Sequence, residues 1–318
     1  MSEQSSEVSL QRSSSRTHSF SSANLENWKL CDLRLDLERK LRRRNLRHHG
    51  QLKNGATKKS VNLFFRYNAR SISELYDQCS PEEWADLLYT ADVNIHKHLN
   101  VALELYIKEV LTVQRHDRWL WFVKNAEYFP EEVNELINIF NAQKIDITKF
   151  ANDVYLLLRC MDPKINCLRL IGLPNSGKSL IGQLLVSPFV SSYVNNHNSE
   201  NEFYLSSFLN KAVCICEELM ITPATAEDFK SILGGAKLDI SKKYTSKQVL
   251  IRTPIIVTSN HEKFGRGHLN PADEYALSIR CYTYFFINAY KPKCNISLSA
   301  LAYLIYTYCD YPNKSAFY

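Results

Sequence analysis

The sequence of 318 residues lacks any apolar run approaching the ~20 residues that a membrane-spanning helix needs. Its N-terminal segment, from Met1 to Ser22, is polar and serine-rich, and so lacks the apolar core of a secretory signal peptide. We therefore expect no membrane partner and no export.

Paired cysteine motifs are also missing. The nine cysteines are an odd number and include no C-x-x-C pair, which argues against a zinc ribbon and against a disulfide framework. Cys214 and Cys216 lie two residues apart in an apolar run, so on a strand they would share one face. Reduced, buried thiols in a cytosolic or nuclear protein are the simplest interpretation.

Acidic residues are absent from one long segment. Arg39 to Lys59 holds nine Lys and Arg residues and no acid, whereas the net charge of the whole chain is only +6. Such a block repels itself and attracts polyanions, which points weakly to nucleic acid. Its densest part, Arg39 to Arg47, would suit nuclear import or non-specific DNA contact, and a solvated helix face explains it equally well.

The pattern along the chain predicts several regions. Apolar residues make up 45% and charged residues 23%, as in an ordinary globular protein, and the length suggests about two domains plus tails. The expected divisions are a disordered Ser-rich and basic tail over 1–65, a helical domain over 66–160, an α/β domain over 161–290 and a C-terminal helical tail over 291–318.

The helical domain is predicted from helix start signals and apolar spacing. Ser80 is followed by Pro81 and by Glu83, which together form a capping box with proline at the first helical position. Further helices are expected over Val101 to Val113, from Pro130, and from a cap at Asp146 or Thr148.

Short apolar strands begin at Cys167. The runs 167–171, 212–216, 255–258 and 282–287 alternate with helical or loop stretches. Strands that are nearly continuous in apolar residues indicate a sheet buried on both faces. The expected fold class is therefore α/β with a mostly parallel sheet.

One motif carries chemistry at the end of the first strand. Residues 172–179 read G-L-P-N-S-G-K-S and match the P-loop pattern G-x-x-x-x-G-K-[ST] at every fixed position. Lys178 would neutralise the β- and γ-phosphates of ATP, and the Ser179 hydroxyl would bind Mg²⁺. The predicted nucleotide-binding residues are Gly172, Pro174, Asn175, Ser176, Gly177, Lys178 and Ser179. The alternative, a glycine-rich turn with an incidental lysine, is disfavoured because strand, loop and helix all agree.

Hydrolysis needs a carboxylate beside the phosphates. The strand 212–216 ends in Glu217 and Glu218, at the sheet edge where the P-loop should also lie. Glu217 would hold the Mg²⁺ shell, and Glu218 would orient and deprotonate the attacking water. Asn260 ends another apolar strand and could contact the γ-phosphate. The alternatives are a solvated acidic pair and an asparagine in a turn.

The order of these motifs resembles that of superfamily 3 helicases. The segments are G-L-P-N-S-G-K-S, V-C-I-C-E-E, F-K-S-I-L-G-G with a lysine-rich stretch, T-P-I-I-V-T-S-N and S-I-R-C-Y-T-Y-F-F. The set is most similar to the large non-structural replication proteins of parvoviruses, especially those of insect densoviruses and bidensoviruses, and it covers roughly residues 141–287. The ordered set is far more specific than any single motif.

The resemblance implies an AAA-type P-loop ATPase that forms a homo-oligomeric ring, a hexamer or similar, and moves 3′ to 5′ on DNA. It makes Glu218, Asn260 and Arg280 the catalytic residues, with Asn260 as sensor and Arg280 as an arginine finger for the neighbouring subunit. Without this family, Arg280 cannot be told from a surface arginine. The helical domain would then be the collar that helps the ring to assemble.

The resemblance also implies a DNA-binding β-hairpin that projects into the ring channel. Residues 239–249 hold Lys242, Lys243, Tyr244 and Lys247. Lysine binds phosphate and tyrosine can stack on a base, so single-stranded and forked DNA are the expected partners. A solvated basic loop is equally compatible with the sequence alone.

The chain departs from the long family members, which carry a nicking endonuclease with a His-hydrophobic-His metal site. The pairs His48-His49 and His96-Lys97-His98 lack the hydrophobic central residue. We therefore expect no nicking here, and separate nicking or replication proteins as partners.

Three functions stay open on the residues. The first is an ATP-dependent DNA helicase of viral replication in the host nucleus. The second is an ATP-dependent DNA-binding or packaging protein without strand separation. The third is a DNA-binding factor with a vestigial P-loop.

Overall fold

The computed structural model describes residues 55–91, 94–194, 203–242 and 245–311. The predicted tail therefore lies, up to residue 54, outside the described residues. Within the described part, no helix is both long enough and apolar enough to cross a membrane.

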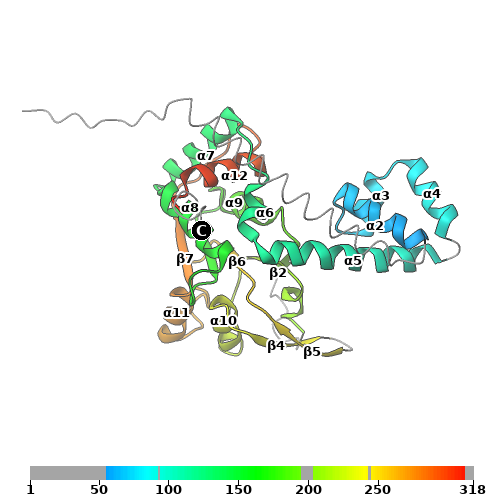
Figure 1. Ribbon diagram of the computed structural model, residues 1–318. Coiled ribbons are helices and arrows are strands. Elements are labelled where there is room, and N and C mark those ends of the chain that lie inside the picture. Colours follow the sequence, from blue (N-terminus) through cyan, green and yellow to red (C-terminus); the bar gives the residue numbers. More distant parts are fainter. Residues whose placement is uncertain (1–54, 92–93, 195–202, 243–244, 312–318) are drawn as a thin grey trace, which may run out of the picture.

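A five-stranded sheet forms the centre of the molecule (Figure 1), in the order β2-β3-β6-β1-β7. All of its neighbouring strands are parallel. The strands are β1 (Cys167–Gly172), β2 (Ser191–Val194), β3 (Val213–Glu217), β6 (Ile255–Ser259) and β7 (Cys281–Phe286). The parallel α/β sheet predicted from the sequence is confirmed. Strand β2 was not predicted, because only Val194 among its four residues is buried.

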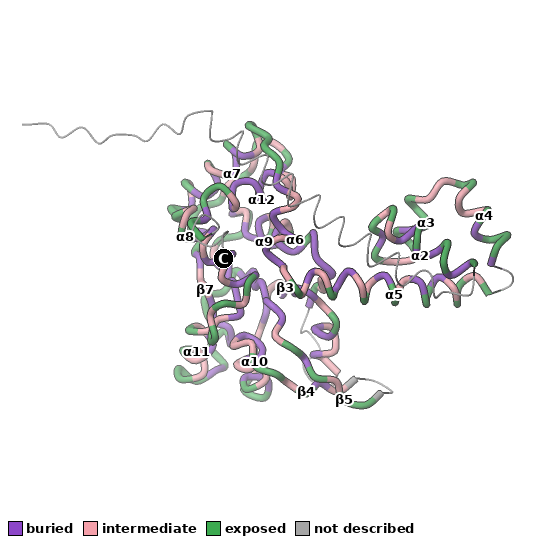
Figure 2. The backbone as a smooth tube through the Cα atoms, in the orientation of Figure 1, coloured by how far each residue is buried: buried purple, intermediate pink, exposed green. Residues whose placement is uncertain are grey.

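The central strands β3, β6 and β1 are buried on both faces, as their apolar sequences require (Figure 2). Side chains alternate along each strand, so Leu168 and Leu170 of β1 join one hydrophobic core, whereas Cys167 joins the other. Beside the sheet, the helices of the first core are α6 (Arg118–Val123), α7 (Pro130–Ala142), α8 (Ile147–Arg159), α9 (Lys178–Val186) and α12 (Leu298–Tyr308), and this core continues into the helices of residues 55–116. The second core holds η2 (Ser206–Phe208), α10 (Ala226–Leu233) and α11 (Pro271–Ser278).

A helical lobe stands apart from the sheet at the end of one long helix (Figure 1). It consists of α2 (Gly55–Tyr67), α3 (Ile72–Gln78), α4 (Pro81–Ala91) and α5 (Ile95–His116). The capping box forms as predicted: the Glu83 amide donates to the Ser80 hydroxyl (3.2 Å), and the Ser80 amide donates to the Glu83 carboxylate (3.3 Å). The Asp146 cap of α8 also forms, with its carboxylate accepting from the Lys149 amide at 3.1 Å.

The helices lie differently from the predicted divisions at two points. Helix α2 begins at Gly55 and buries Phe64 completely, so the helical region starts before residue 65. Helices α6, α7 and α8 all contact α12, and α8 also contacts β1, so these three helices of the predicted 66–160 domain lie with the part of the molecule that holds the sheet. The C-terminal segment holds a helix, as expected, and α12 buries its residues 300–305 in the same core.

The lobe is tied to the segment that follows α9. The Arg70 guanidinium donates to the carbonyls of Ser187 (2.9 Å) and Phe189 (2.7 Å). Gln114 of α5 accepts from the Val190 amide at 2.8 Å, and the indole of Trp121 donates to the Pro188 carbonyl at 2.8 Å. These bonds join the lobe and the neighbouring helix α6 to residues 187–190, which follow the C-terminal end of α9.

An antiparallel hairpin leaves the sheet on the side of α10 (Figure 1). Its strands are β4 (Leu238–Lys242) and β5 (Thr245–Leu250), which agrees with the hairpin expected over 239–249. Residues 243–244 at its tip lie outside the described residues.

Candidate active site

The phosphate-binding motif forms the turn between β1 and α9. Gly172 has φ +138° in the turn, and a Cβ there would lie 2.0 Å from the Phe286 carbonyl oxygen of β7, so only glycine fits. Gly177 has φ +94° and is the N-cap of α9, which begins at Lys178. The motif thus presents the amide end of α9 to any anion in the turn.

The turn is supported from behind by two other segments. The Gln143 side chain, at the end of α7, donates to the carbonyls of Ser176 (3.3 Å) and Asn288 (2.8 Å). The Tyr290 amide donates to the Asn175 carbonyl at 2.8 Å. Because these carbonyls are occupied on the outer side, the conformation of the turn is fixed before a ligand binds.

Lys178 is buried at the base of the turn, with 5% of its surface exposed. Its ammonium donates to the carbonyl oxygens of Gly172 (3.0 Å) and Leu173 (2.5 Å) and to the side-chain oxygen of Asn260 (3.1 Å). Burial lowers the pKa of this ammonium, and the nearby Glu218 carboxylate opposes that shift. A buried cation held mostly by neutral oxygens favours an anionic ligand, such as a phosphate group.

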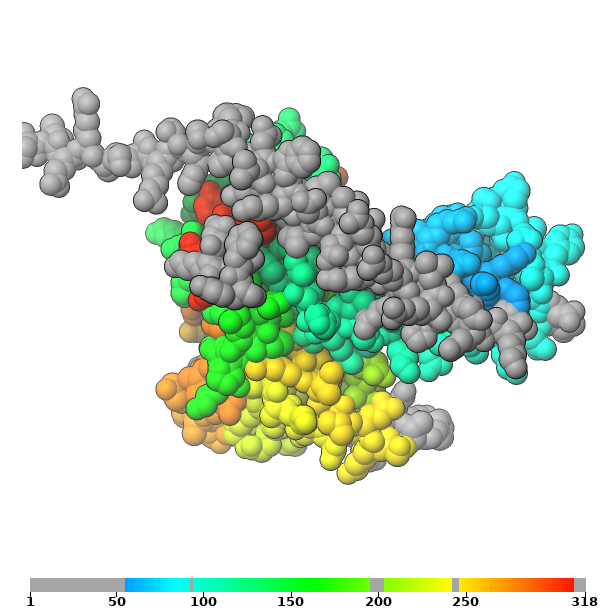
Figure 3. Space-filling model, viewed as in Figure 1, coloured from blue at the N-terminus to red at the C-terminus, as the bar shows by residue number. Residues whose placement is uncertain are grey.

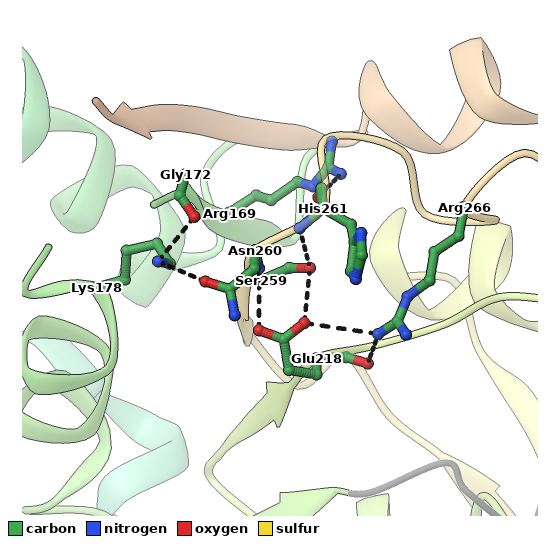
Figure 4. Close-up of polar contacts among 8 residues, drawn as sticks. All are labelled: Arg169, Gly172, Lys178, Glu218, Ser259, Asn260, His261 and Arg266. Atoms are coloured by element: carbon green, nitrogen blue, oxygen red, sulfur yellow. Dashed lines mark hydrogen bonds and ion pairs between the residues drawn. The ribbon is translucent and has the colours of Figure 1, made fainter. Parts of the chain in front are cut away.

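Glu218 faces Lys178 across the edge of the sheet (Figure 4). Its carboxylate accepts from the backbone amide of Asn260 at 3.0 Å and from the Ser259 hydroxyl at 3.4 Å. Asn260 therefore contacts Lys178 with its side chain and Glu218 with its backbone. The neighbouring strands β3 and β6 place these groups together, as the sequence predicts for the carboxyl ends of parallel strands.

A cavity of about 320 Å³ lies between these groups. It is lined by residues 174–180 together with Glu218, Thr258 and Asn260. The cavity thus joins backbone amides, a buried cation, the Ser179 hydroxyl and a carboxylate, which suits a triphosphate. Mg²⁺ is usually held by one or two protein oxygens, waters and the phosphates themselves, so the Ser179 hydroxyl on the cavity wall fits as a ligand of such an ion.

Glu217 lies next to the cavity and is not part of its lining. Its carboxylate accepts from the Gln183 side-chain amide of α9 at 3.0 Å. Its expected contact with the Mg²⁺ shell stays a prediction.

Arg280 lies at the amino ends of the strands, whereas the phosphate-binding turn lies at their carboxyl ends. It precedes Cys281, which pairs with Cys167 at the start of β1, whereas Gly172 pairs with Phe286 at the other end. The half-buried guanidinium donates to the Ala276 carbonyl at the end of α11. The fold thus does not bring Arg280 to the cavity of its own chain.

Of the predicted DNA-binding residues, Lys247 is exposed on β5. Lys243 and Tyr244 lie outside the described residues, and of Lys242 only the backbone position in β4 is described. The hairpin's role in DNA binding stays a prediction.

Sequence reasoning missed Arg266, which contacts Glu218 (Figure 4). Its guanidinium donates to the Glu218 carbonyl at 2.9 Å and lies 3.6 Å from the carboxylate. Its signal, one basic residue six positions after Asn260, matches no motif spacing.

Known proteins with similar sequences include viral initiator and replication proteins. The initiator protein NS1 of Bombyx mori densovirus is 27% identical over 159 residues, a match that covers 50% of this chain and 16% of that protein. The replication protein E1 of bovine papillomavirus type 1 is 30% identical over 129 residues, which cover 39% of this chain and 21% of that protein. The chain therefore spans less than a quarter of the length of these curated relatives.

The fold also resembles a solved helicase. A crystal structure of JCV helicase superposes with a TM-score of 0.50 at 14% identity, covering 73% of this chain and 77% of that one. The family model for parvovirus non-structural protein NS1 matches residues 79–263, more than half of the chain. The chain therefore belongs to the parvovirus non-structural protein NS1 family.

Proposed function

We propose that this chain is an ATP-hydrolysing DNA helicase that acts in viral replication. The observation that carries the proposal is the shared cavity in which Lys178 and Glu218 face each other, with Asn260 in contact with both. A phosphate cradle alone would bind nucleotide. A carboxylate across the same cavity adds a group that can orient water toward the γ-phosphate.

ATP and Mg²⁺ fit this arrangement as substrate and metal. The buried Lys178 would balance the charge of the β- and γ-phosphates, and the Ser179 hydroxyl would be an Mg²⁺ ligand. Asn260 would detect the γ-phosphate, because its amide oxygen lies 3.1 Å from the Lys178 ammonium that would bind it. The proposal includes a nuclear location, since the basic run Arg39 to Arg47 would suit nuclear import.

A ring of identical subunits would complete the site. Arg280 lies at the amino end of its strand, away from the cavity of its own chain. The nucleotide that it could contact is therefore one bound by a neighbouring copy. The lobe exposes large apolar side chains, which suits contact with another copy. These side chains are Tyr76, Leu88, Tyr89, Val101 and Leu105.

Mixing two inactive variants tests catalysis between subunits. Arg280→Ala keeps an intact cavity and lacks the arginine, whereas Lys178→Ala lacks the cavity lysine and keeps the arginine. Each alone is expected to hydrolyse ATP at least ~100-fold more slowly than the parent. An equal mixture should recover up to about a quarter of the parental rate, because a quarter of random head-to-tail contacts combine both intact parts. A mixture no more active than its components would contradict a role of Arg280 between subunits.

Strand separation distinguishes a helicase from an ATP-dependent binding or packaging protein. We expect the chain to unwind a forked duplex only with hydrolysable ATP, and to unwind a duplex with a 3′ tail at least ~10-fold faster than one with a 5′ tail. The measurement is release of a labelled strand. ATP hydrolysis and DNA binding without release would favour the packaging alternative.

Lys247→Ala tests the role of the hairpin, with DNA affinity and release of the labelled strand as the two measurements. The lost phosphate contact should weaken binding of single-stranded DNA. It should also make the slope of log affinity against log salt concentration shallower by about one. Unwinding should fall accordingly. Lys108→Ala on α5 removes the same charge from an exposed position and is the matched control. Equal salt dependence in the two variants would remove Lys247 from the DNA-binding surface.

A further inference from the structure

The segment that follows β6 has an unusual backbone where it meets Glu218. Arg266 and Glu218 both have left-handed φ angles, +50° and +51°, although neither is glycine. Such conformations persist only where the surroundings impose them, and they concentrate at functional sites. The two residues are in direct contact, so the strained backbone lies where two segments meet.

Two sets of side-chain interactions fix this segment. The guanidinium of Arg169, a buried residue of β1, donates to the carbonyls of His261 (3.4 Å) and Glu262 and stacks on the Phe264 ring at 3.9 Å. The Glu274 carboxylate of α11 accepts from the amides of Phe264 (3.0 Å) and Gly265 (2.6 Å). The backbone that carries Arg266 is therefore fixed from the central strand and from α11.

Arg266 contacts Glu218 at two points. Its guanidinium donates to the Glu218 carbonyl at 2.9 Å and forms an ion pair with the carboxylate at 3.6 Å. The first contact fixes the backbone of Glu218, and the second restricts its side chain. With the bonds from Ser259 and Asn260, both carboxylate oxygens have partners on the sheet side of the cavity.

We propose that Arg266 is a positioning residue that holds Glu218 in the orientation needed to activate the attacking water, an inference that rests on the proposed ATPase function. Arg266 lies outside the cavity lining, so it acts through Glu218 and does not bind nucleotide itself. A single guanidinium nitrogen, Nη2, reaches both the carbonyl and the carboxylate of Glu218, so one group holds the backbone and the side chain together.

Arg266→Ala should therefore lower kcat about 10- to 100-fold and leave nucleotide affinity within about twofold of the parent. Arg266→Lys should recover only part of the loss, since the lysine chain is one bond shorter and does not carry its ammonium as far as the Nη2 that makes both contacts. The measurements are steady-state ATP hydrolysis of the full chain with Mg²⁺ and titration with a fluorescent ATP analogue. Lys263→Ala removes an equal charge from an exposed position in the same segment, and should behave like the parent.

A double-mutant cycle separates positioning from a merely structural effect. In the Glu218→Gln background, Arg266→Ala should change the residual single-turnover rate by less than about twofold, because the group that it positions is already disabled. A parental kcat for Arg266→Ala would overturn the inference. So would a full additional loss in the Glu218→Gln background, or a loss of nucleotide affinity that parallels the loss of rate.

The inference and the proposed function fail in different ways. If the parent chain hydrolyses ATP no faster than Lys178→Ala, the proposed ATPase function fails. If the parent is active and Arg266→Ala is equally active, only the role of Arg266 fails. Thermal unfolding of each variant should stay within a few degrees of the parent, since Arg266 is exposed and adds nothing to either core.

Discussion

Replacement of Lys178 by alanine is expected to abolish nucleotide binding and ATP hydrolysis together. The ammonium lies at the base of the cavity, in contact with Asn260 and with two carbonyls of the phosphate-binding turn. Without it, the negative charge of the phosphates has no buried counter-charge. We expect kcat/KM to fall at least ~1000-fold, measured by phosphate release, and the fluorescent analogue to bind too weakly for titration to saturate.

A loss of fold would mimic this result, because Lys178 is buried. Lys178→Met keeps the apolar stem and removes only the charge, so it should lose activity equally while retaining the unfolding temperature of the parent. Lys263→Ala controls for the general loss of a positive charge. Tight nucleotide binding by Lys178→Met would show that the turn is no phosphate site.

Glu218→Gln is expected to separate binding from hydrolysis. Glutamine has nearly the same shape and can still accept the hydrogen bond from the Asn260 amide, which the carboxylate accepts at 3.0 Å in the structure. It cannot take a proton from water. Nucleotide affinity should therefore stay close to that of the parent, whereas kcat should fall about 100- to 1000-fold in a single-turnover assay.

Glu217→Gln is the matched comparison, because it changes the adjacent carboxylate, which lies outside the cavity lining. If Glu217 contributes to the Mg²⁺ shell, this variant should need more Mg²⁺ for half-maximal rate and should recover at high Mg²⁺. The assigned roles would be reversed if Glu217→Gln lost hydrolysis irrecoverably while Glu218→Gln remained active.

The sheet and the phosphate-binding turn were predictable because their signals are local. Apolar runs of four to six residues report strands buried on both faces, and the P-loop pattern specifies residue types at fixed spacing. Glu218 and Asn260 followed from geometry, since the carboxyl ends of parallel strands meet at one edge. Strand β2 escaped because three of its four residues are only partly buried or exposed.

The remaining features depend on contacts between segments that are distant in sequence. A helix with one apolar stripe can pack against other helices or against a sheet, and the sequence of α8 does not distinguish the two. Its partner α12 lies at the other end of the chain. Arg266 meets Glu218 only because Arg169 and Glu274 fix the intervening backbone, and no spacing rule encodes that arrangement.

The bonds between the lobe and the segment after α9 have a mechanical consequence. Helix α9 has the phosphate-binding turn at one end, and at the other end a segment held by Arg70 and Gln114 of the lobe. A lobe that rotated against the sheet would have to break these hydrogen bonds or carry α9 with it. Force applied to the lobe would thus pass along the axis of a single helix to the residues that surround the phosphates.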